Sequence, residues 1–133
     1  MANADAVIRA TRAYLNVPFV HLGRSRAGVD CIGLHVLALR DLGHEVQDCE
    51  YYDRLPSADD LQTYIRKSCV EVDPTDDPGT YITTWIAQRG VPQHVALLTD
   101  RGMIHTWIAP NKVVEHPFDA YWRKRVVAYW NLI

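Results

Sequence analysis

The sequence predicts a single α+β domain in which helices come first and an antiparallel β-meander follows. Apolar residues recur at helical spacing in the first half of the chain, whereas the second half holds short β-rich segments separated by Gly, Pro, Asp and Asn turns. Such segregation of helices from strands is typical of α+β folds. A chain of 133 residues has the length of one domain, so we take residues 1–133 as one unit.

Three helices are expected before the sheet. Residues 3–15 place apolar side chains at helical spacing. Residues 31–42 are apolar on most faces, which predicts a buried helix, and Asp30 stands where its N-cap belongs. Residues 58–69 are expected to form a third helix, and the glycine-containing segment 16–30 is expected to be a loop.

The strands of the meander are expected at residues 81–87, 94–99, 103–108, 113–115 and 126–130. Between the second and third of them, Asp100-Arg101-Gly102 is typical of a tight hairpin turn. Residues 117–124 are expected to contain a short helix before the last strand.

Charge and hydropathy exclude several classes of partner. The net charge is −2, and the 14 Lys and Arg are spread along the chain, so we expect no nucleic-acid partner. No run of about 18 apolar residues exists, so we expect no membrane partner. The first residues lack the basic and apolar regions of a signal peptide. We therefore expect a protein made in the cytoplasm without Sec-type export.

The three cysteines, Cys31, Cys49 and Cys69, are far apart and include no C-x-x-C pair. This excludes a four-cysteine zinc site and disfavours a disulfide framework. Cys49 and Cys69 are expected to be buried and inert. We expect no cofactor and no metal.

Cys31 follows the predicted N-cap directly and would be the first residue of the buried helix. Free N–H groups and the helix dipole at that position favour a thiolate, which predicts a lowered pKa for Cys31. Its own N–H could help to bind an oxyanion. Position alone does not distinguish such a reactive thiol from a buried structural cysteine.

His94 opens an apolar strand, and His105 lies eleven residues later, across the predicted hairpin turn. The two side chains should lie roughly opposite each other, so that one imidazole can orient the other. The alternative for His94 is an ordinary residue at the rim of a sheet. A zinc site made by Cys31, His94, His105 and His21 is chemically conceivable, but no pair has a recognised metal spacing.

The remaining histidines carry weaker expectations. His21 lies in the loop before Cys31 and could reach the same cleft. His35 lies one helical turn after Cys31 and belongs either to the core or to the cleft wall. His44 and His116 flank turns and are expected to be solvated.

Two blocks of the sequence resemble a known family. Residues 18–36, PFVHLGRSRAGVDCIGLHV, are similar to the active-site stretch of NlpC-type papain-like cysteine peptidases, where a glycine-rich loop runs into Gly-hydrophobic-Asp-Cys-Ser-Gly and a helix. Residues 93–107, QHVALLTDRGMIHTW, resemble the second block, in which a histidine opens an apolar strand and another polar residue follows about a dozen residues later. The similarity covers most of residues 3–130, but only these blocks are specific.

The resemblance implies a papain-like fold and a peptidoglycan endopeptidase that cuts stem peptides through a thioester. It implies a catalytic triad of Cys31, His94 and His105. The substrate and oxyanion cleft would contain Phe19, His21, Asp30 and Gly33. The chain looks most similar to small members of phage and gene-transfer-particle tails, which implies a virion location and tail-tip or baseplate proteins as partners.

The chain departs from the family pattern at two positions, with Phe19 for the usual tyrosine and Ile32 for the usual serine. Phe19 removes a hydroxyl from the expected cleft, and His21 could replace it. Two alternatives remain open. One is a structural tail protein that keeps the fold with an idle cleft, and the other is amidase or acyl-transfer chemistry at the same cysteine.

Overall fold

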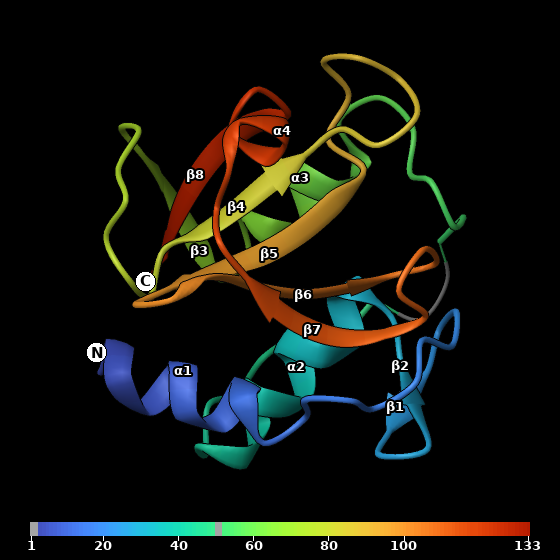
Figure 1. Ribbon diagram of the computed structural model, residues 1–133, viewed down its shortest axis with the longest axis vertical. Helices are drawn as coiled ribbons and strands as arrows, with labels where there is room; N and C mark the ends of the chain where they lie inside the picture. The colour runs from blue at the N-terminus through green and yellow to red at the C-terminus, as the bar shows by residue number, and fades with distance from the viewer. Residues whose placement is uncertain (1–2, 50–51) are drawn as a thin grey trace.

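The computed structural model describes residues 3–49 and 52–133 (Figure 1). Its helices are α1 (Ala4–Arg12), α2 (Cys31–Asp41), α3 (Asp60–Ile65) and α4 (Ala120–Arg123). Its strands are β1 (Arg24–Ser25), β2 (Gly28–Val29), β3 (Cys69–Val72), β4 (Tyr81–Thr84), β5 (His94–Thr99), β6 (Gly102–Trp107), β7 (Lys112–His116) and β8 (Val126–Leu132). The predicted α+β class, with leading helices and an antiparallel sheet, is confirmed.

The six-stranded sheet has the order β3-β8-β4-β5-β6-β7, and all its pairs are antiparallel. The predicted meander is correct for β4 to β7. It is wrong for β8, which inserts between β4 and β3, so that Trp130 pairs with Tyr81 on one side and Glu71 on the other. Residues 58–69 were expected to be one helix, but α3 ends at Ile65 and Cys69 already pairs with Leu132 of β8. Strand β3 depends on this distant partner, which local spacing does not reveal.

The predicted loop over residues 16–30 contains a small hairpin of β1 and β2. The hairpin packs closely against the first turn of α2. A Cβ atom at Gly33 would lie 2.3 Å from the carbonyl oxygen of Gly23, and one at Gly23 would lie 2.4 Å from that of Gly28. Only hydrogen fits at these contacts, so the glycines let the loop approach the start of the helix.

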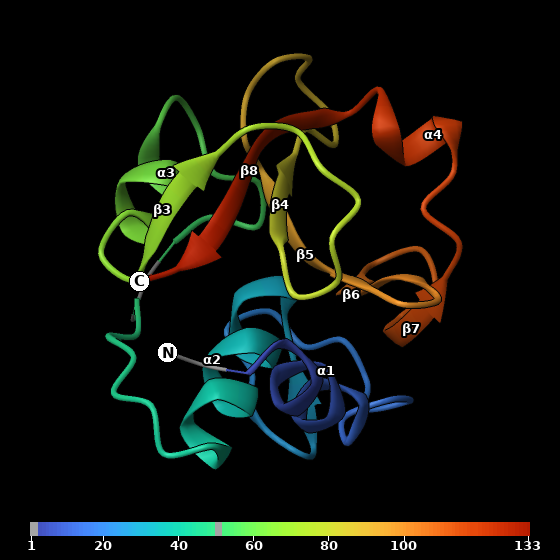
Figure 2. The ribbon, with the colours of Figure 1, turned by 90° about the vertical axis from the view of Figure 1, so that its left-hand side faces the viewer.

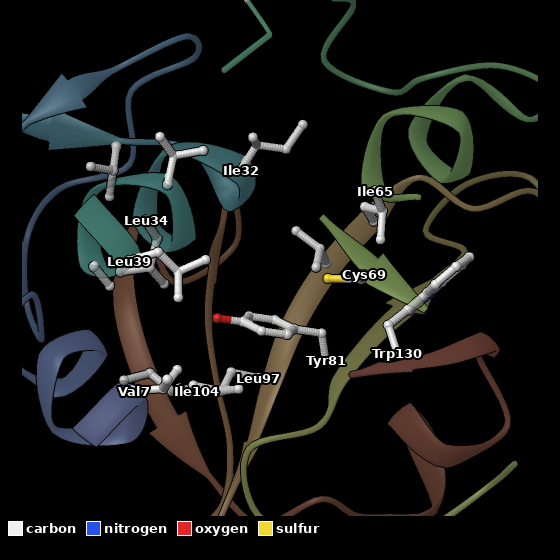
Figure 3. Close-up of a cluster of buried hydrophobic side chains, with 14 of the residues drawn as sticks. Val7, Ile32, Leu34, Leu39, Ile65, Cys69, Tyr81, Leu97, Ile104 and Trp130 are labelled. Atoms are coloured by element: carbon white, nitrogen blue, oxygen red, sulfur yellow. The ribbon is translucent and has the colours of Figure 1, made fainter. Parts of the chain in front are cut away.

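The main core lies between the sheet and α1, α2 and α3 (Figures 1 and 2). Leu34 of α2 and Ile104 of β6 are fully buried there, and each such side chain stabilises the fold by about 1.5–3 kcal/mol. Helix α4 covers the other side of the sheet, where Trp122 packs with Leu98 and Met103. Figure 3 shows the Tyr81 hydroxyl pointing into the main core, and this oxygen has no hydrogen-bond partner in the described part of the chain.

No helix among the described residues is long and apolar enough to cross a membrane.

Candidate active site

Cys31 is the first residue of α2, as the sequence predicts. The Asp30 carboxylate caps the helix because its Oδ1 accepts hydrogen bonds from the N–H groups of Ile32, at 3.2 Å, and Gly33, at 2.8 Å. The thiol therefore stands at a well-formed helix N-terminus whose second and third N–H groups are already used. The N–H of Cys31 itself donates no hydrogen bond to the Asp30 side chain.

Asp30 does more than cap the helix. Its Oδ2 accepts from the Leu22 N–H at 2.8 Å and from the Tyr52 hydroxyl, while Arg24 donates to Oδ1 at 3.0 Å. The residue is only 2% exposed, and both oxygens are engaged. Asp30 lines the expected cleft, and its carboxylate holds the loop, the helix and Tyr52 together there.

Gly33 lies outside the cleft and underneath the β1–β2 hairpin, where its missing side chain permits the contact with Gly23. The expectation that Gly33 lies in the cleft is therefore wrong. Like Asp30, it determines where Cys31 is held.

Cys31, His94, Phe19 and His21 line one cleft, which has a volume of about 220 Å³. The sequence predicts that these four residues line one cleft. The rest of the wall combines the apolar side chains of Leu55, Ile86, Trp107 and Ile108 with polar residues, which are Asp30, Tyr52, Arg54, Gln93 and Thr106. A substrate here would meet apolar surface interrupted by polar groups that can orient it.

Gln93 shapes the opposite wall. Its Oε1 accepts hydrogen bonds from three consecutive N–H groups, those of Ile86, Ala87 and Gln88, at 3.1, 2.9 and 3.0 Å. The side chain is buried, and it fixes the loop after β4 against the start of β5. This bridge places Ile86 beside His94 in the cleft wall.

His94 and His105 are joined directly, with 2.7 Å between His94 Nε2 and His105 Nδ1. The β5–β6 turn lies where the sequence predicts it, because Thr99 pairs with Gly102 and Leu97 with Ile104. Continuing that register sets His105 opposite Ala96, so the two histidines are diagonal neighbours instead of direct opposites. Diagonal pairs on one face are within reach of long side chains, and the imidazoles use that reach.

His116 extends this pair to a row of three rings. His105 Nε2 lies 2.7 Å from His116 Nε2, and His116 Nδ1 lies 2.9 Å from the Pro117 carbonyl oxygen. His116 is half-exposed, so the expectation that it is solvated is correct only in part, and its ring also packs against His105 and Trp122. A repeated spacing of eleven residues, from His94 to His105 and from His105 to His116, is the signal that sequence reasoning missed.

The environment of the cleft disfavours the charged forms of both Cys31 and His94. Burial, followed by the adjacent Asp30 carboxylate, raises the pKa of Cys31 to about 12, although the Val95 backbone acts in the opposite direction. Burial, and then repulsion from His35, lowers the pKa of His94 to about 3. The pKa of Cys31 is therefore raised and not lowered as its place at the helix terminus predicts, because burial and the Asp30 carboxylate disfavour the thiolate. Thiol and imidazole are both neutral at rest.

No hydrogen bond joins the Cys31 thiol to His94 in the part of the chain that the structure describes, although both groups line the same cleft. Resting cysteine–histidine pairs are often loose and tighten only when substrate binds. The described residues hold no cluster of three or more His, Cys, Asp or Glu side chains suited to a metal ion.

Comparison with known proteins rests on structure, because no family model matches the sequence and neither does any curated protein. The chain superposes on an NlpC/P60 family protein from Bacillus cereus with a TM-score of 0.72 and 23% identity, over 96% of this chain and 39% of that one. NlpC2 from Trichomonas vaginalis gives a TM-score of 0.72 at 18% identity, over 98% of this chain and 49% of that one. The NlpC/p60 domain of the peptidoglycan hydrolase SagA gives 0.66 at 17%, over 99% of this chain and 100% of that domain.

The chain has the NlpC/P60 fold. It spans less than half of the Bacillus and Trichomonas chains, but all of the SagA domain. Within this fold, Cys31 opens the helix and His94 opens the neighbouring strand, as the two resembling sequence blocks imply.

Tyr52 brings a phenol to the wall of this NlpC/P60 cleft, where Phe19 lacks one. Its hydroxyl donates to Asp30 and accepts from Arg24 Nη2 at 2.8 Å. These two hydrogen bonds occupy the hydroxyl of Tyr52, so it does not replace the hydroxyl that Phe19 lacks. His21 of the glycine-rich loop also brings a polar group to this cleft, and its ring lies 5.7 Å from the Tyr52 ring.

The other two cysteines lie outside this cleft. Cys69 is buried, and burial raises its pKa to about 12, as expected for an inert thiol. Cys49 is partly buried beside a separate hollow next to α3. Cys31 is the thiol that shares a cleft with His94.

Proposed function

We propose that this protein is a cysteine peptidase that hydrolyses peptidoglycan stem peptides, with Cys31 as the nucleophile, His94 as the base and His105 orienting His94. One observation carries the proposal: a cysteine at a helix N-terminus and a histidine paired to a second histidine line the same cleft. This combination supplies the nucleophile, base and orienter that thiol peptidases need. The hydrolase to which the SagA domain belongs supports peptidoglycan as the substrate class.

The reaction begins with neutral partners. As Cys31 Sγ attacks the peptide carbonyl carbon, the thiol proton passes to the free nitrogen of His94, and the carbonyl oxygen becomes an oxyanion near the Cys31 N–H. The carbon–nitrogen bond then breaks, and the leaving amine takes the proton from His94. This leaves a thioester on Cys31. Water, deprotonated by His94, hydrolyses the thioester and regenerates the thiol.

The raised pKa of Cys31 suits this general-base route. A buried thiolate would lack solvation, whereas a neutral thiol needs to lose its proton only as the bond to carbon forms. Movement of the proton from Cys31 to His94 leaves the net charge of the cleft unchanged. The chemistry therefore requires the two groups to come into contact when substrate enters.

A structural protein with an idle cleft is the second candidate. The neutral resting thiol and the missing thiol–imidazole hydrogen bond within the described residues favour it, as does the absence of a hydroxyl at Phe19. The location in a phage tail stays a prediction from the sequence resemblance.

Fragment release from purified peptidoglycan tests the proposal. The parent protein, Cys31→Ala and the matched control Cys49→Ala are incubated at equal folded concentration with walls of several cross-link types, and the products are identified by mass. We expect stem-peptide fragments from the parent and from Cys49→Ala, and none from Cys31→Ala. A parent protein that releases nothing from any wall would favour the structural candidate.

A further inference from the structure

The three histidines form a hydrogen-bonded row whose far end is a backbone carbonyl. A carbonyl oxygen only accepts hydrogen bonds, so the proton in the 2.9 Å contact with Pro117 must belong to His116 Nδ1. In a neutral His116 ring, Nε2 then carries no proton and acts as an acceptor. The fixed end therefore determines the direction of the next bond.

The same reasoning passes along the row. His105 Nε2 must carry the proton that it shares with His116, at 2.7 Å, which leaves His105 Nδ1 as an acceptor. His94 Nε2 must then carry the proton in its 2.7 Å bond to His105. The remaining nitrogen of His94, Nδ1, is left without a proton. An unprotonated ring nitrogen is what a general base needs in order to accept the thiol proton of Cys31.

The surroundings of His105, the middle ring of the row, keep it neutral and hold its two hydrogen bonds. His105 is fully buried, its ring stacks on Trp107 with centroids 4.3 Å apart, and Trp122 meets it edge-on at 4.8 Å. Burial, and then repulsion from the neighbouring histidines, lowers the pKa of His105 well below its ordinary value. Because His105 is fully buried among these rings, its own hydrogen bonds to His94 and His116 are shielded from water, and the direction set at Pro117 is transmitted to His94.

We propose that His116 is a positioning residue of the active site: held by the Pro117 carbonyl, it fixes the tautomer of His94 through His105 and so presents Nδ1 of His94 as the base. This role rests on the proposed function of His94. When Nδ1 takes the proton of Cys31, His94 becomes an imidazolium that still donates its Nε2 proton to His105. One proton moves, none is lost, and the new positive charge lies beside an acceptor already aligned for it.

Two substitutions separate this role from mere packing. His116→Phe keeps a planar ring but offers no acceptor to His105 Nε2. His116→Gln places an amide oxygen as acceptor for His105 and an amide N–H as donor to Pro117. We expect kcat for peptidoglycan fragments to fall about tenfold in His116→Phe, the loss typical of one positioning hydrogen bond, with KM unchanged. His116→Gln should recover most of that loss.

Nitrogen-15 spectra of the imidazoles test the same claim without substrate. In the parent protein at neutral pH, His94 should show a protonated Nε2 and an unprotonated Nδ1, and His116 a protonated Nδ1. His116→Phe should leave His94 in a mixture of tautomers, whereas His116→Gln should preserve the single form. A parent protein that cleaves no wall would remove the proposed function, but these spectra would still decide the tautomer of His94.

Three results would overturn the inference. The first is a parent His94 protonated on Nδ1, and this outcome does not depend on whether any variant folds. The second is a His116→Phe protein with the parent's tautomer and kcat. The third is a His116→Gln protein that is as impaired as His116→Phe, since an acceptor would then not be what His116 supplies.

Discussion

Acid should destabilise this protein well above the pH at which its carboxylates protonate, because it buries neutral histidines. Burial lowers the pKa of His35 to about 4, partly offset by the Val95 backbone, and that of His94 to about 3. The pKa of His105 is also held well below its ordinary value by burial. In the unfolded chain all three titrate near 6.5. Below that value the unfolded state binds more protons, so stability falls as pH falls.

The magnitude follows from the linkage between protonation and folding. A histidine that ionises only in the unfolded state lowers the free energy of unfolding at pH 5.5 by about 1.4 kcal/mol relative to pH 8. Three such residues cost about 4 kcal/mol, which is a large fraction of the 5–15 kcal/mol typical of a domain. The lowered pKa values of Asp48, Asp100 and Glu115 act in the same direction but only near pH 4 and below, where unfolded carboxylates protonate.

His35 allows the contribution of one ring to be isolated. It is 5% exposed, and neither ring nitrogen makes a well-formed hydrogen bond in the described part of the chain, since the contact with the Val95 backbone does not have that geometry. His35→Leu removes two unpartnered polar atoms and keeps a similar volume. Its free energy of unfolding at pH 8 should therefore be no lower than that of the parent, and higher by up to about 1–3 kcal/mol. Between pH 8 and 5.5 the variant should lose about 1.4 kcal/mol less than the parent.

Denaturant unfolding followed by tryptophan fluorescence at pH 8, 6.5 and 5.5 measures both quantities. The pH 8 value of each protein serves as its own reference, so a general effect of the substitution cancels from the slope. A parent whose free energy of unfolding is flat over this range would refute the claim that these histidines are buried and neutral. A His35→Leu variant with the parent's slope would refute the assignment to His35.

Three further outcomes are expected. Iodoacetamide should modify Cys31 faster than the buried Cys69. His94→Ala should slow the modification of Cys31 if the imidazole is the base for the thiol. Equal rates in the parent and in His94→Ala, measured by peptide mass, would count against that role. Phe19→Tyr should raise kcat/KM about twofold to tenfold, because it adds one hydroxyl to the cleft, and an unchanged value would show that the hydroxyl is dispensable. Gly33→Ala should lower the free energy of unfolding by about 1–3 kcal/mol, because its Cβ would meet the Gly23 backbone at 2.3 Å, and a Tm equal to the parent's would contradict that contact.

Local signals in the sequence were sufficient for the placement of Cys31 and His94. An apolar run preceded by Asp30 predicts the helix and its cap, because capping involves residues two and three positions apart. The Asp100–Gly102 turn predicts the β5–β6 hairpin and therefore the meeting of His94 with His105. Both inferences use contacts between residues close in the chain.

The features that sequence reasoning missed depend on distant contacts. Strand β8 lies between β3 and β4 because of pairings across about 50 residues or more, such as Tyr81 with Trp130 and Cys69 with Leu132. The raised pKa of Cys31 comes from its desolvation in the wall of the folded cleft and from the Asp30 carboxylate, whereas the local position at a helix end predicts a lowered one. The sequence predicts Asp30 as the helix N-cap, but it does not reveal the further hydrogen bonds of its carboxylate with Arg24 and Tyr52.

The central claim, that Cys31 is the nucleophile, is tested most directly by trapping its thioester. The parent protein is mixed with peptidoglycan fragments, quenched in acid within the first turnovers, digested and examined by mass spectrometry. The account predicts an added mass equal to the acyl part of the cleaved peptide, on the segment that contains Cys31 and removable by hydroxylamine, with no addition at Cys49 or Cys69. Fragment release without any acyl adduct on Cys31, or undiminished release by Cys31→Ala, would contradict it.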